Sequence, residues 1–247
     1  MSTSDRLPLL RVLPSDVASR VLVVGDPARA EAAAKSLEDA EHVGDNREYS
    51  TFTGTFGGQR ITVASHGVGS AGAGVCFEEL ARAGAKIFVR AGTCGSLKET
   101  ISDGELIIAT GAVRDEGLTP RLVPLSYPAV AHHEVTGALL GAAEGSGRRV
   151  HQGLVLSSDV FYPSAALGQS FEIWQKSGVV GVEMEVATLF VIASLHKLRA
   201  GGVLVVDGNP ARASEDMSDY DPYRKVVSDG TQVMINLALE ALASLEP

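Results

Sequence analysis

Two acidic side chains interrupt an otherwise apolar segment in the C-terminal third of the chain. Residues 179–182 predict a buried strand and residues 187–195 an apolar helix, and Glu183 and Glu185 lie where one gives way to the other. Apolar packing gives no reason for carboxylates there. A carboxylate only accepts hydrogen bonds, which suits sugar hydroxyls, so Glu185 is a candidate for holding a sugar. The alternative is local, because the helix dipole stabilises an acid in the first turn of a helix.

Arg90 directly follows a predicted buried strand, 86–89, and small residues follow it as far as Ser96. A guanidinium at the end of a central strand is costly unless it is paired. Arg90 and the hydroxyls of Thr93 and Ser96 are therefore a candidate phosphate site at the carboxyl end of the strand.

Arg29 and Arg47 are two further candidates for binding an anion. Arg29 falls in the first turn of a predicted helix, 28–37, where the helix dipole disfavours a cation. An anion bound by both the helix N-terminus and Arg29 would remove this cost. Arg47 precedes a predicted β-hairpin, 51–64, whose turn is Gly57-Gly58. Either arginine could instead be an ordinary solvated surface residue.

The segment Ser65–Gly72 contains the pattern G-x-G-x-x-G and opens a predicted helix, 73–83. Such a pattern also occurs in dinucleotide-binding proteins. Here the preceding strand belongs to a hairpin, and Arg90 rather than an acid follows about 20 residues on. Arg90 could meet a 2′-phosphate, so a nicotinamide-dependent reductase is an alternative to a smaller ligand approached by the glycine backbone.

Asp207 and Phe161 each follow a predicted strand and complete the set of candidate residues. Asp207 ends the strand 202–206, where it could close a ligand site, although Asp-Gly pairs are also common in turns. Phe161 and Tyr162 follow the strand 150–156, where a ring could stack on a flat ligand or anchor a loop on the core.

The composition bounds the class of protein. The chain has 247 residues, 45% of them hydrophobic and 21% charged, and predicts one domain with a loose arm at 1–19 and a candidate flap at 213–223. A net charge of −9 argues against nucleic acid and anionic membranes as partners. No apolar run is long enough to span a bilayer, and the N-terminus lacks the apolar core of a secretory signal. The two cysteines lack metal-ligand spacing and suit a reducing compartment, so we expect a cytoplasmic protein.

Six segments, taken in order, resemble the hexameric nucleoside phosphorylases, the family of uridine phosphorylase and bacterial-type purine nucleoside phosphorylase. The likeness is greatest to the parasite-type purine nucleoside phosphorylases and runs from about residue 20 to the C-terminus. The segments are Val23–Arg29, Asn46–Tyr49, Ser65–Gly69, Arg90–Ser96, Val182–Glu185 and the strand-ending Asp207. The resemblance implies a single α/β domain with a mixed, largely parallel, twisted and partly barrel-like sheet flanked by helices. It also implies reversible phosphorolysis, in which a purine nucleoside and phosphate give a free base and ribose 1-phosphate, without a metal or cofactor.

The resemblance also implies roles for individual residues. The phosphate-binding residues are expected to be Gly25, Arg29, Arg47, Arg90 and Thr93. Arg47 would reach in from the neighbouring subunit of a homo-oligomer, a hexamer built as a trimer of dimers. The ribose would be held by Met184 and Glu185, and the base would be lined by Phe161, Val68, Val182 and Glu183. Asp207 would protonate N7 of a purine, or donate a hydrogen bond to it.

Departures from the family's pattern bear on the substrate. Relatives often have a His in the N-terminal arm that reaches the neighbouring subunit's sugar, whereas this chain has Leu9 near that place and no His before His42. Arg212 resembles only loosely the arginine that assists the acid in some relatives, which favours inosine and guanosine over adenosine. Uridine phosphorylases carry a Gln and an Arg after the aromatic segment, and 164–169 lacks that pair, although it contains Gln169. A purine is the better fit, and the alternatives are a uridine phosphorylase, a nucleosidase of the same fold, or an inactive protein that binds nucleosides.

Overall fold

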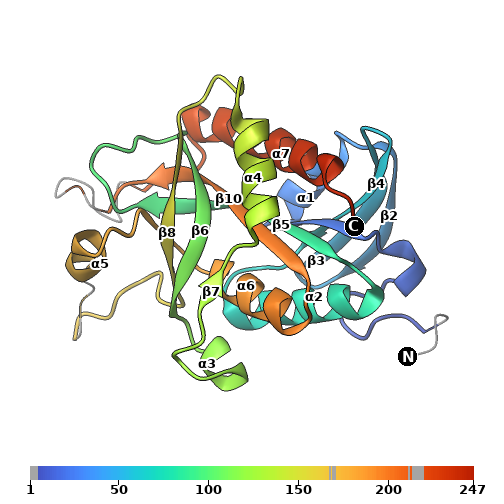
Figure 1. The fold of residues 1–247 in the computed structure, drawn as a ribbon, viewed down its shortest axis with the longest axis horizontal. Helices are drawn as coiled ribbons and strands as arrows, with labels where there is room; N and C mark the ends of the chain where they lie inside the picture. Colours follow the sequence, from blue (N-terminus) through green and yellow to red (C-terminus); the bar gives the residue numbers. More distant parts are fainter. Residues whose placement is uncertain (1–4, 167, 169–170, 211, 213–219) are drawn as a thin grey trace.

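The computed structural model describes residues 5–166, 168, 171–210, 212 and 220–247. Its framework is one mixed sheet with the strand order β10-β6-β8-β9-β5-β1-β4-β3-β2 and with β7 paired to β6 (Figure 1). The strands are β1 (Arg20–Val24), β2 (Glu38–Asn46), β3 (Tyr49–Phe56), β4 (Gln59–Ser65), β5 (Ile87–Ser96), β6 (Leu106–Asp115), β7 (Ala129–Val130), β8 (Val150–Ser158), β9 (Gly181–Glu183) and β10 (Arg199–Gly208).

Part of the sheet closes on itself. Strand β10 pairs with β6 on one side and with β5 on the other, so β5, β10, β6, β8 and β9 form a ring. The remaining strands, β1, β4, β3 and β2, extend from β5 as an open sheet. The prediction of a mixed, partly barrel-like α/β sheet is confirmed.

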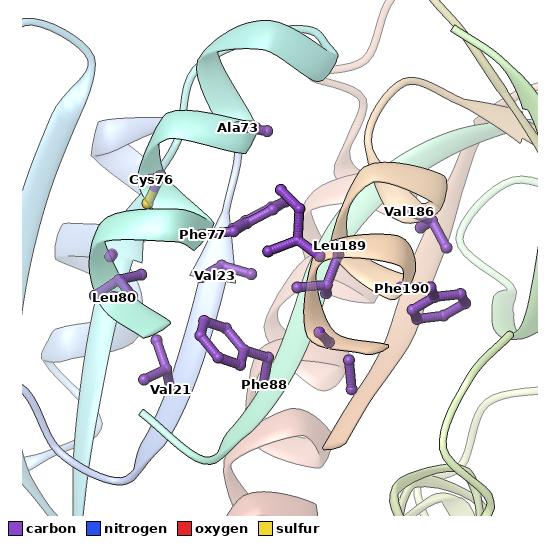
Figure 2. Close-up of a cluster of buried hydrophobic side chains, with 14 of the residues drawn as sticks. Val21, Val23, Ala73, Cys76, Phe77, Leu80, Phe88, Val186, Leu189 and Phe190 are labelled. Atoms are coloured by element: carbon purple, nitrogen blue, oxygen red, sulfur yellow. The ribbon is translucent and has the colours of Figure 1, made fainter. Parts of the chain in front are cut away.

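Helices cover both faces of this sheet. They are α1 (Pro27–Ala34), α2 (Ser70–Ala83), α3 (Thr119–Leu122), α4 (His133–Ala143), α5 (Glu172–Lys176), α6 (Val186–Leu195) and α7 (Lys225–Ser244), with a short 3₁₀ helix η1 (Pro14–Asp16). Helices α2 and α6 pack on one face, and α1, α4 and α7 on the other. Figure 2 shows the first of these cores, where Phe77 of α2, Val23 of β1, Phe88 of β5 and Leu189 of α6 are buried together. No helix in the described ranges is long and apolar enough to cross a bilayer.

Strand β5 is longer than predicted, and this changes the setting of Arg90. The sequence predicts that the strand ends at residue 89, whereas it runs to Ser96. The reason is tertiary, because β10 pairs beside it from Gly202, opposite Arg90, as far as Gly208, opposite Gly95. Arg90 therefore lies inside a strand of the closed ring rather than in the loop after it.

The N-terminal arm is packed, and the expectation of a loose arm is wrong for residues 5–19. Leu7 and Leu10 are buried in the core that lies under α2. The carboxylate of Glu79 accepts the backbone N–H groups of Leu9 and Leu10, both at less than 3.0 Å. Of the predicted flap, 213–219 lies outside the described residues.

Candidate active site

Three neighbouring parallel strands, β4, β1 and β5, bring polar residues to one edge of the sheet. Val23 of β1 pairs with Arg90, so Arg90 lies level with the end of β1 although β5 continues beyond it. The backbone N–H of Gly67 donates to the carbonyl of Gly25 at 2.9 Å, which joins the loops that follow β4 and β1. Helix α1 begins at the same edge and carries Arg29 in its first turn. Ligands of open α/β sheets bind at such carboxyl ends.

The guanidinium of Arg90 is buried and contacts three side chains. Its Nε donates to Glu183 Oε2 at 3.2 Å, and Nη2 donates to Glu185 Oε2 at 2.5 Å. Its Nη1 lies 2.9 Å from Nε2 of His66. Burial opposes the charge on Arg90, but the carboxylates of Glu185 and Glu183 outweigh it and raise the pKa of Arg90. Arg90 is therefore a fixed positive charge inside the protein.

Glu183 caps the start of α6. Its two carboxylate oxygens accept from the N–H of Val186 at 2.9 and 3.0 Å, and Oε2 also accepts from the N–H of Glu185 at 2.7 Å. Ser157 donates to the same carboxylate and accepts from the N–H of Ala187 at 2.9 Å. The first N–H groups of a helix have no partner within the helix. Capping these groups is therefore a structural reason for the presence of Glu183 in this apolar segment. Its contact with a base stays a prediction.

Glu185 lies between Arg90 and the glycine loop. Its Oε2 faces Arg90, and its Oε1 accepts from the backbone N–H of Gly69 at 2.6 Å. Gly69 has φ of 91°, a conformation that other residues rarely adopt, so the loop needs glycine there to present this N–H. Burial raises the pKa of Glu185 above its usual value, against the opposing effect of Arg90. The glycine pattern thus positions a backbone N–H group that donates a hydrogen bond to Glu185.

Arg29 supplies a second guanidinium beside Arg90. Burial and the positive charge of Arg90 lower the pKa of Arg29. Within the described part of the chain, no hydrogen bond or ion pair engages the Arg29 guanidinium. Two like charges in a partly buried place repel each other, and an anion between them removes that cost. The first turn of α1 contributes to the same positive field. The pair of arginines is therefore suited to an oxyanion.

Asp207 closes the site at the end of β10. It is buried and accepts hydrogen bonds from the hydroxyl of Tyr220, at 2.8 Å, and from that of Thr93. Burial raises the pKa of Asp207, although these hydrogen bonds and the charge of Arg29 oppose the shift. Arg224 donates to the backbone carbonyl of Asp207 at 2.9 Å. The carboxyl group is held in place with its pKa moved toward that of a proton donor.

Aromatic and apolar side chains border this acid and the glycine loop. The ring of Phe161 lies 5.8 Å from that of Tyr220, which itself bonds to Asp207, and 5.0 Å from that of Tyr162. Phe161 and Tyr162 are exposed, as is Val68 in the glycine loop. Ser70 at the start of α2 donates to Asp159 at 2.8 Å, so the glycine loop lies near the segment that carries Phe161. Large apolar side chains left exposed near one another are typical of a ligand-binding surface.

The remaining predicted residues lie in two places. Val182 and Met184 are half-buried on either side of Glu183. Arg47 is exposed at the turn between β2 and β3, with φ of 57°. Among the described contacts none joins Arg47 to Arg29 or Arg90, so its part in the site stays a prediction. No group of three or more His, Cys, Asp or Glu in the described ranges is arranged to hold a metal.

Comparison with known proteins decides the family. The family model of the phosphorylase superfamily matches residues 19–243, which is most of the chain. This chain belongs to the phosphorylase superfamily.

Members with related sequences and structures cover nearly the whole chain. A purine nucleoside phosphorylase of Plasmodium vivax is 40% identical over 226 residues, covering 91% of each chain. A uridine phosphorylase of Treponema pallidum is 37% identical over 240 residues, covering 94% of this chain and 91% of its own. A crystal structure of purine nucleoside phosphorylase from Toxoplasma gondii in complex with immucillin-H matches with a TM-score of 0.93 at 35% identity, covering 98% of this chain and 97% of that one. The resemblance inferred from the sequence is confirmed. A nicotinamide-dependent reductase is excluded, because the chain belongs to a family of pentosyltransferases.

Three residues of this candidate site were not predicted from the sequence. They are His66, Gly92 and Tyr220. His66 directly follows β4 within the glycine pattern, which is a signal that could have been used. Gly92 is two residues beyond Arg90 on the same strand face, and a Cβ there would lie 2.8 Å from Nη2 of Arg90. Tyr220 follows a polar, acidic segment, and nothing local in the sequence links it to Asp207.

Proposed function

We propose that this enzyme catalyses the reversible phosphorolysis of purine nucleosides, with inosine and guanosine preferred, to the free base and ribose 1-phosphate. The observation that carries the proposal is that Arg90, which is bonded to the buried carboxylate of Glu185, lies near enough to Arg29 for its charge to lower the pKa of Arg29. The arginines supply a place for phosphate and the carboxylate a place for sugar hydroxyls. Such an enzyme serves purine salvage.

The phosphate would lie between Arg29 and Arg90, close to Gly25 and Thr93. Arginine suits this role because its guanidinium keeps its proton and meets an oxyanion with forked hydrogen bonds. At Gly25, a Cβ would meet a backbone oxygen at 3.5 Å and the His66 ring at 3.9 Å, which are ordinary contacts, so packing alone does not require glycine there. The absence of a side chain there leaves the α1 N-terminus open to the anion.

The sugar would be gripped by Glu185 with Met184 beneath it. Cleavage of the glycosidic bond makes the anomeric carbon cationic, and a phosphate held below the ring stabilises that charge and then forms the new carbon–oxygen bond. The electron pair of the broken bond passes to the base. Asp207, whose pKa is raised by burial, would donate a proton or a hydrogen bond to N7 of the leaving purine. The base would be bordered by Phe161, Val68, Val182 and Glu183.

A purine is favoured over a pyrimidine by the acid and by the relatives. Asp207 lies next to the aromatic pair Phe161 and Tyr220, where a purine could present N7 to it. The Plasmodium vivax and Toxoplasma gondii relatives are named purine nucleoside phosphorylases. Uridine phosphorolysis is the second candidate, because the Treponema pallidum relative is nearly as similar.

A complete site would need a second copy of the chain. Arg47 is exposed at a hairpin turn, with no described contact to the other two arginines of its own chain. In the proposed homo-oligomer, a hexamer built as a trimer of dimers in the cytoplasm, Arg47 would complete the phosphate site of the neighbouring subunit.

One assay separates these functions. Inosine, guanosine, adenosine and uridine are each incubated with the enzyme, with and without inorganic phosphate, and release of the free base is measured. The proposal predicts release from inosine and guanosine that depends on phosphate. Equal rates without phosphate would indicate a nucleosidase, preference for uridine would indicate the second candidate, and binding without base release would indicate an inactive nucleoside-binding protein.

A further inference from the structure

His66 occupies an unusual position for a histidine, since it is completely buried beside a permanent cation. It follows β4 directly, and the side of its ring meets the edge of Phe77, with ring centroids 5.3 Å apart. Its Nε2 lies 2.9 Å from Nη1 of Arg90, and its Nδ1 lies 2.9 Å from the carbonyl oxygen of Gly67. Both ring nitrogens are therefore engaged, and neither reaches solvent.

The partners of the ring allow only one form of the imidazole. A guanidinium has five N–H donors and no acceptor, so Nε2 of His66 must accept from Arg90. A carbonyl oxygen only accepts, so Nδ1 must carry the proton and donate to Gly67. His66 is thus the neutral tautomer protonated at Nδ1. Burial and the positive charges of Arg90 and Arg29 agree with this, because together they lower the pKa of His66 well below its usual value.

His66 contacts the one nitrogen of Arg90 that no carboxylate engages. The Nε and Nη2 atoms of Arg90 face Glu183 and Glu185. Nη1 has two hydrogens, and His66 accepts one of them. The other hydrogen is thereby held in a fixed direction, and no acceptor for it is found among the described residues.

The charge of the acceptor matters as much as its position. A third carboxylate at residue 66 would hold Arg90 equally well, but it would set three carboxylates against the two arginines, Arg29 and Arg90, and a net negative charge repels an anion. Two carboxylates, Glu183 and Glu185, already face Arg90. A neutral imidazole fixes Arg90 without reducing the positive charge that attracts an oxyanion.

We propose that His66 is a positioning residue of the phosphate site, holding the Arg90 guanidinium by an uncharged hydrogen-bond acceptor so that its free Nη1 hydrogen meets a phosphate oxygen. This inference rests on the proposed function for the identity of the anion. His66 itself does not touch phosphate or the reacting atoms.

Two polar substitutions of His66 distinguish the roles of its two ring nitrogens. The side-chain amide of asparagine reaches about as far as Nδ1, and that of glutamine about as far as Nε2. His66→Gln therefore keeps an acceptor for Arg90, whereas His66→Asn keeps only the contact to Gly67. We expect His66→Asn to raise the dissociation constant of inorganic phosphate, measured by calorimetry without nucleoside, by about tenfold, as for loss of one hydrogen bond to a charged group. His66→Gln should stay within about threefold of the unmodified enzyme.

Steady-state kinetics of the same variants provide a second measurement. His66→Asn should raise the KM for phosphate about as much as the dissociation constant, while kcat at saturating phosphate and the KM for inosine change by less than about threefold. Equal effects of the two substitutions, or none, would overturn the inference while leaving the proposed function intact. Absence of phosphate binding by the unmodified enzyme would overturn both.

A measurement on the unmodified protein does not depend on the variants folding. Nitrogen-15 spectra of histidine-labelled protein should show His66 as the neutral tautomer protonated at Nδ1, with and without phosphate. A doubly protonated ring, or one protonated at Nε2, would contradict the proposed contact.

Discussion

Glu185 Oε2 and Arg90 Nη2 lie 2.5 Å apart, and both side chains are almost completely buried. The residues proposed to hold the sugar and the phosphate are therefore paired with each other. A buried ion pair of this kind is costly to break by removing one partner. This ion pair joins the proposed sugar site to the proposed phosphate site. A substitution of Glu185 is therefore expected to alter phosphate binding, and a substitution of Arg90 is expected to alter sugar binding.

The same substitution at two neighbouring acids distinguishes substrate binding from helix capping. Glu185→Gln should lower kcat/KM for inosine by about 10- to 100-fold, because charge-assisted hydrogen bonds to sugar hydroxyls are lost. Glu183→Gln should lower the free energy of unfolding by about 1–3 kcal/mol, because Glu183 caps α6, and should lower kcat/KM less than Glu185→Gln does. Steady-state kinetics and urea denaturation of both variants provide the comparison. Equal loss of kcat/KM in the two would remove the special role of Glu185.

Asp207→Asn tests the proton donor without changing the shape of the side chain. We expect kcat with inosine to fall by about 10²- to 10⁴-fold, the usual contribution of a positioned acid. Far-ultraviolet circular dichroism should be unchanged, because Asp207 lies at the end of a strand that is paired on both sides. Asp229→Asn, an exposed change on α7 that removes an ion pair to Lys225, is the control and should leave kcat unaltered. Normal turnover by Asp207→Asn would exclude the role.

The raised pKa of Asp207 has opposite consequences for activity and stability. The donor must be protonated, so kcat/KM for inosine should fall as the pH rises through that pKa, and Asp207→Asn should lack this dependence. Between the unfolded value, near ~3.9, and the raised folded value, the native state binds more protons than the unfolded state. The free energy of unfolding due to this group is therefore lost as pH rises through that window. Asp207→Asn should consequently be more stable than the unmodified enzyme at pH 7 in thermal unfolding, and lower stability would contradict the shift.

Gly92 leaves the space that the Arg90 guanidinium occupies. A Cβ at residue 92 would lie 2.8 Å from Nη2 and 2.9 Å from Cζ of Arg90, whose other contacts prevent it from moving freely. Gly92→Ala should raise the KM for phosphate at least about tenfold by displacing the guanidinium. Gly137→Ala, on α4 with nothing near its Cβ position, is the control and should raise the free energy of unfolding by about 0.4–1 kcal/mol. A KM for phosphate in Gly92→Ala equal to that of the control would show that Arg90 adjusts.

Mixed oligomers test whether Arg47 acts across a subunit boundary. Arg47→Ala and Arg29→Ala should each raise the KM for phosphate when made alone. Co-expressed in one cell, they should form oligomers in which an Arg47→Ala subunit keeps its own Arg29 and receives Arg47 from its Arg29→Ala neighbour. Activity at low phosphate should then exceed that of a mixture of the two separately purified variants. Equal activity would indicate that Arg47 serves its own chain or none.

Local patterns in the sequence predicted much of the fold. The β3–β4 hairpin forms around Gly57-Gly58, both of which have positive φ as this type of turn requires. Helix α4 has the predicted bounds, because an apolar stripe and glycines at its end define it locally. Strand β2 was not predicted, since it is polar and mostly exposed at the edge of the sheet, where only its pairing with β3 reveals it.

Less of the candidate site than of the fold could be predicted from such patterns. Charged residues in apolar segments pointed to Arg90 and Glu185, and the structure brings these two together. Contacts that join distant parts of the chain could not be seen, as with His66 on Arg90 and Tyr220 on Asp207. Glu183 carried the same signal as its neighbour but caps a helix in this structure, because the local pattern does not distinguish a ligand contact from a backbone contact.

Phosphorolysis transfers phosphate to the sugar, and isotopic labelling follows that transfer. The enzyme is incubated with inosine and phosphorus-32 inorganic phosphate, and the sugar product is separated and counted. We expect one labelled phosphate in ribose 1-phosphate for each hypoxanthine released. Release of hypoxanthine with unlabelled free ribose would contradict it.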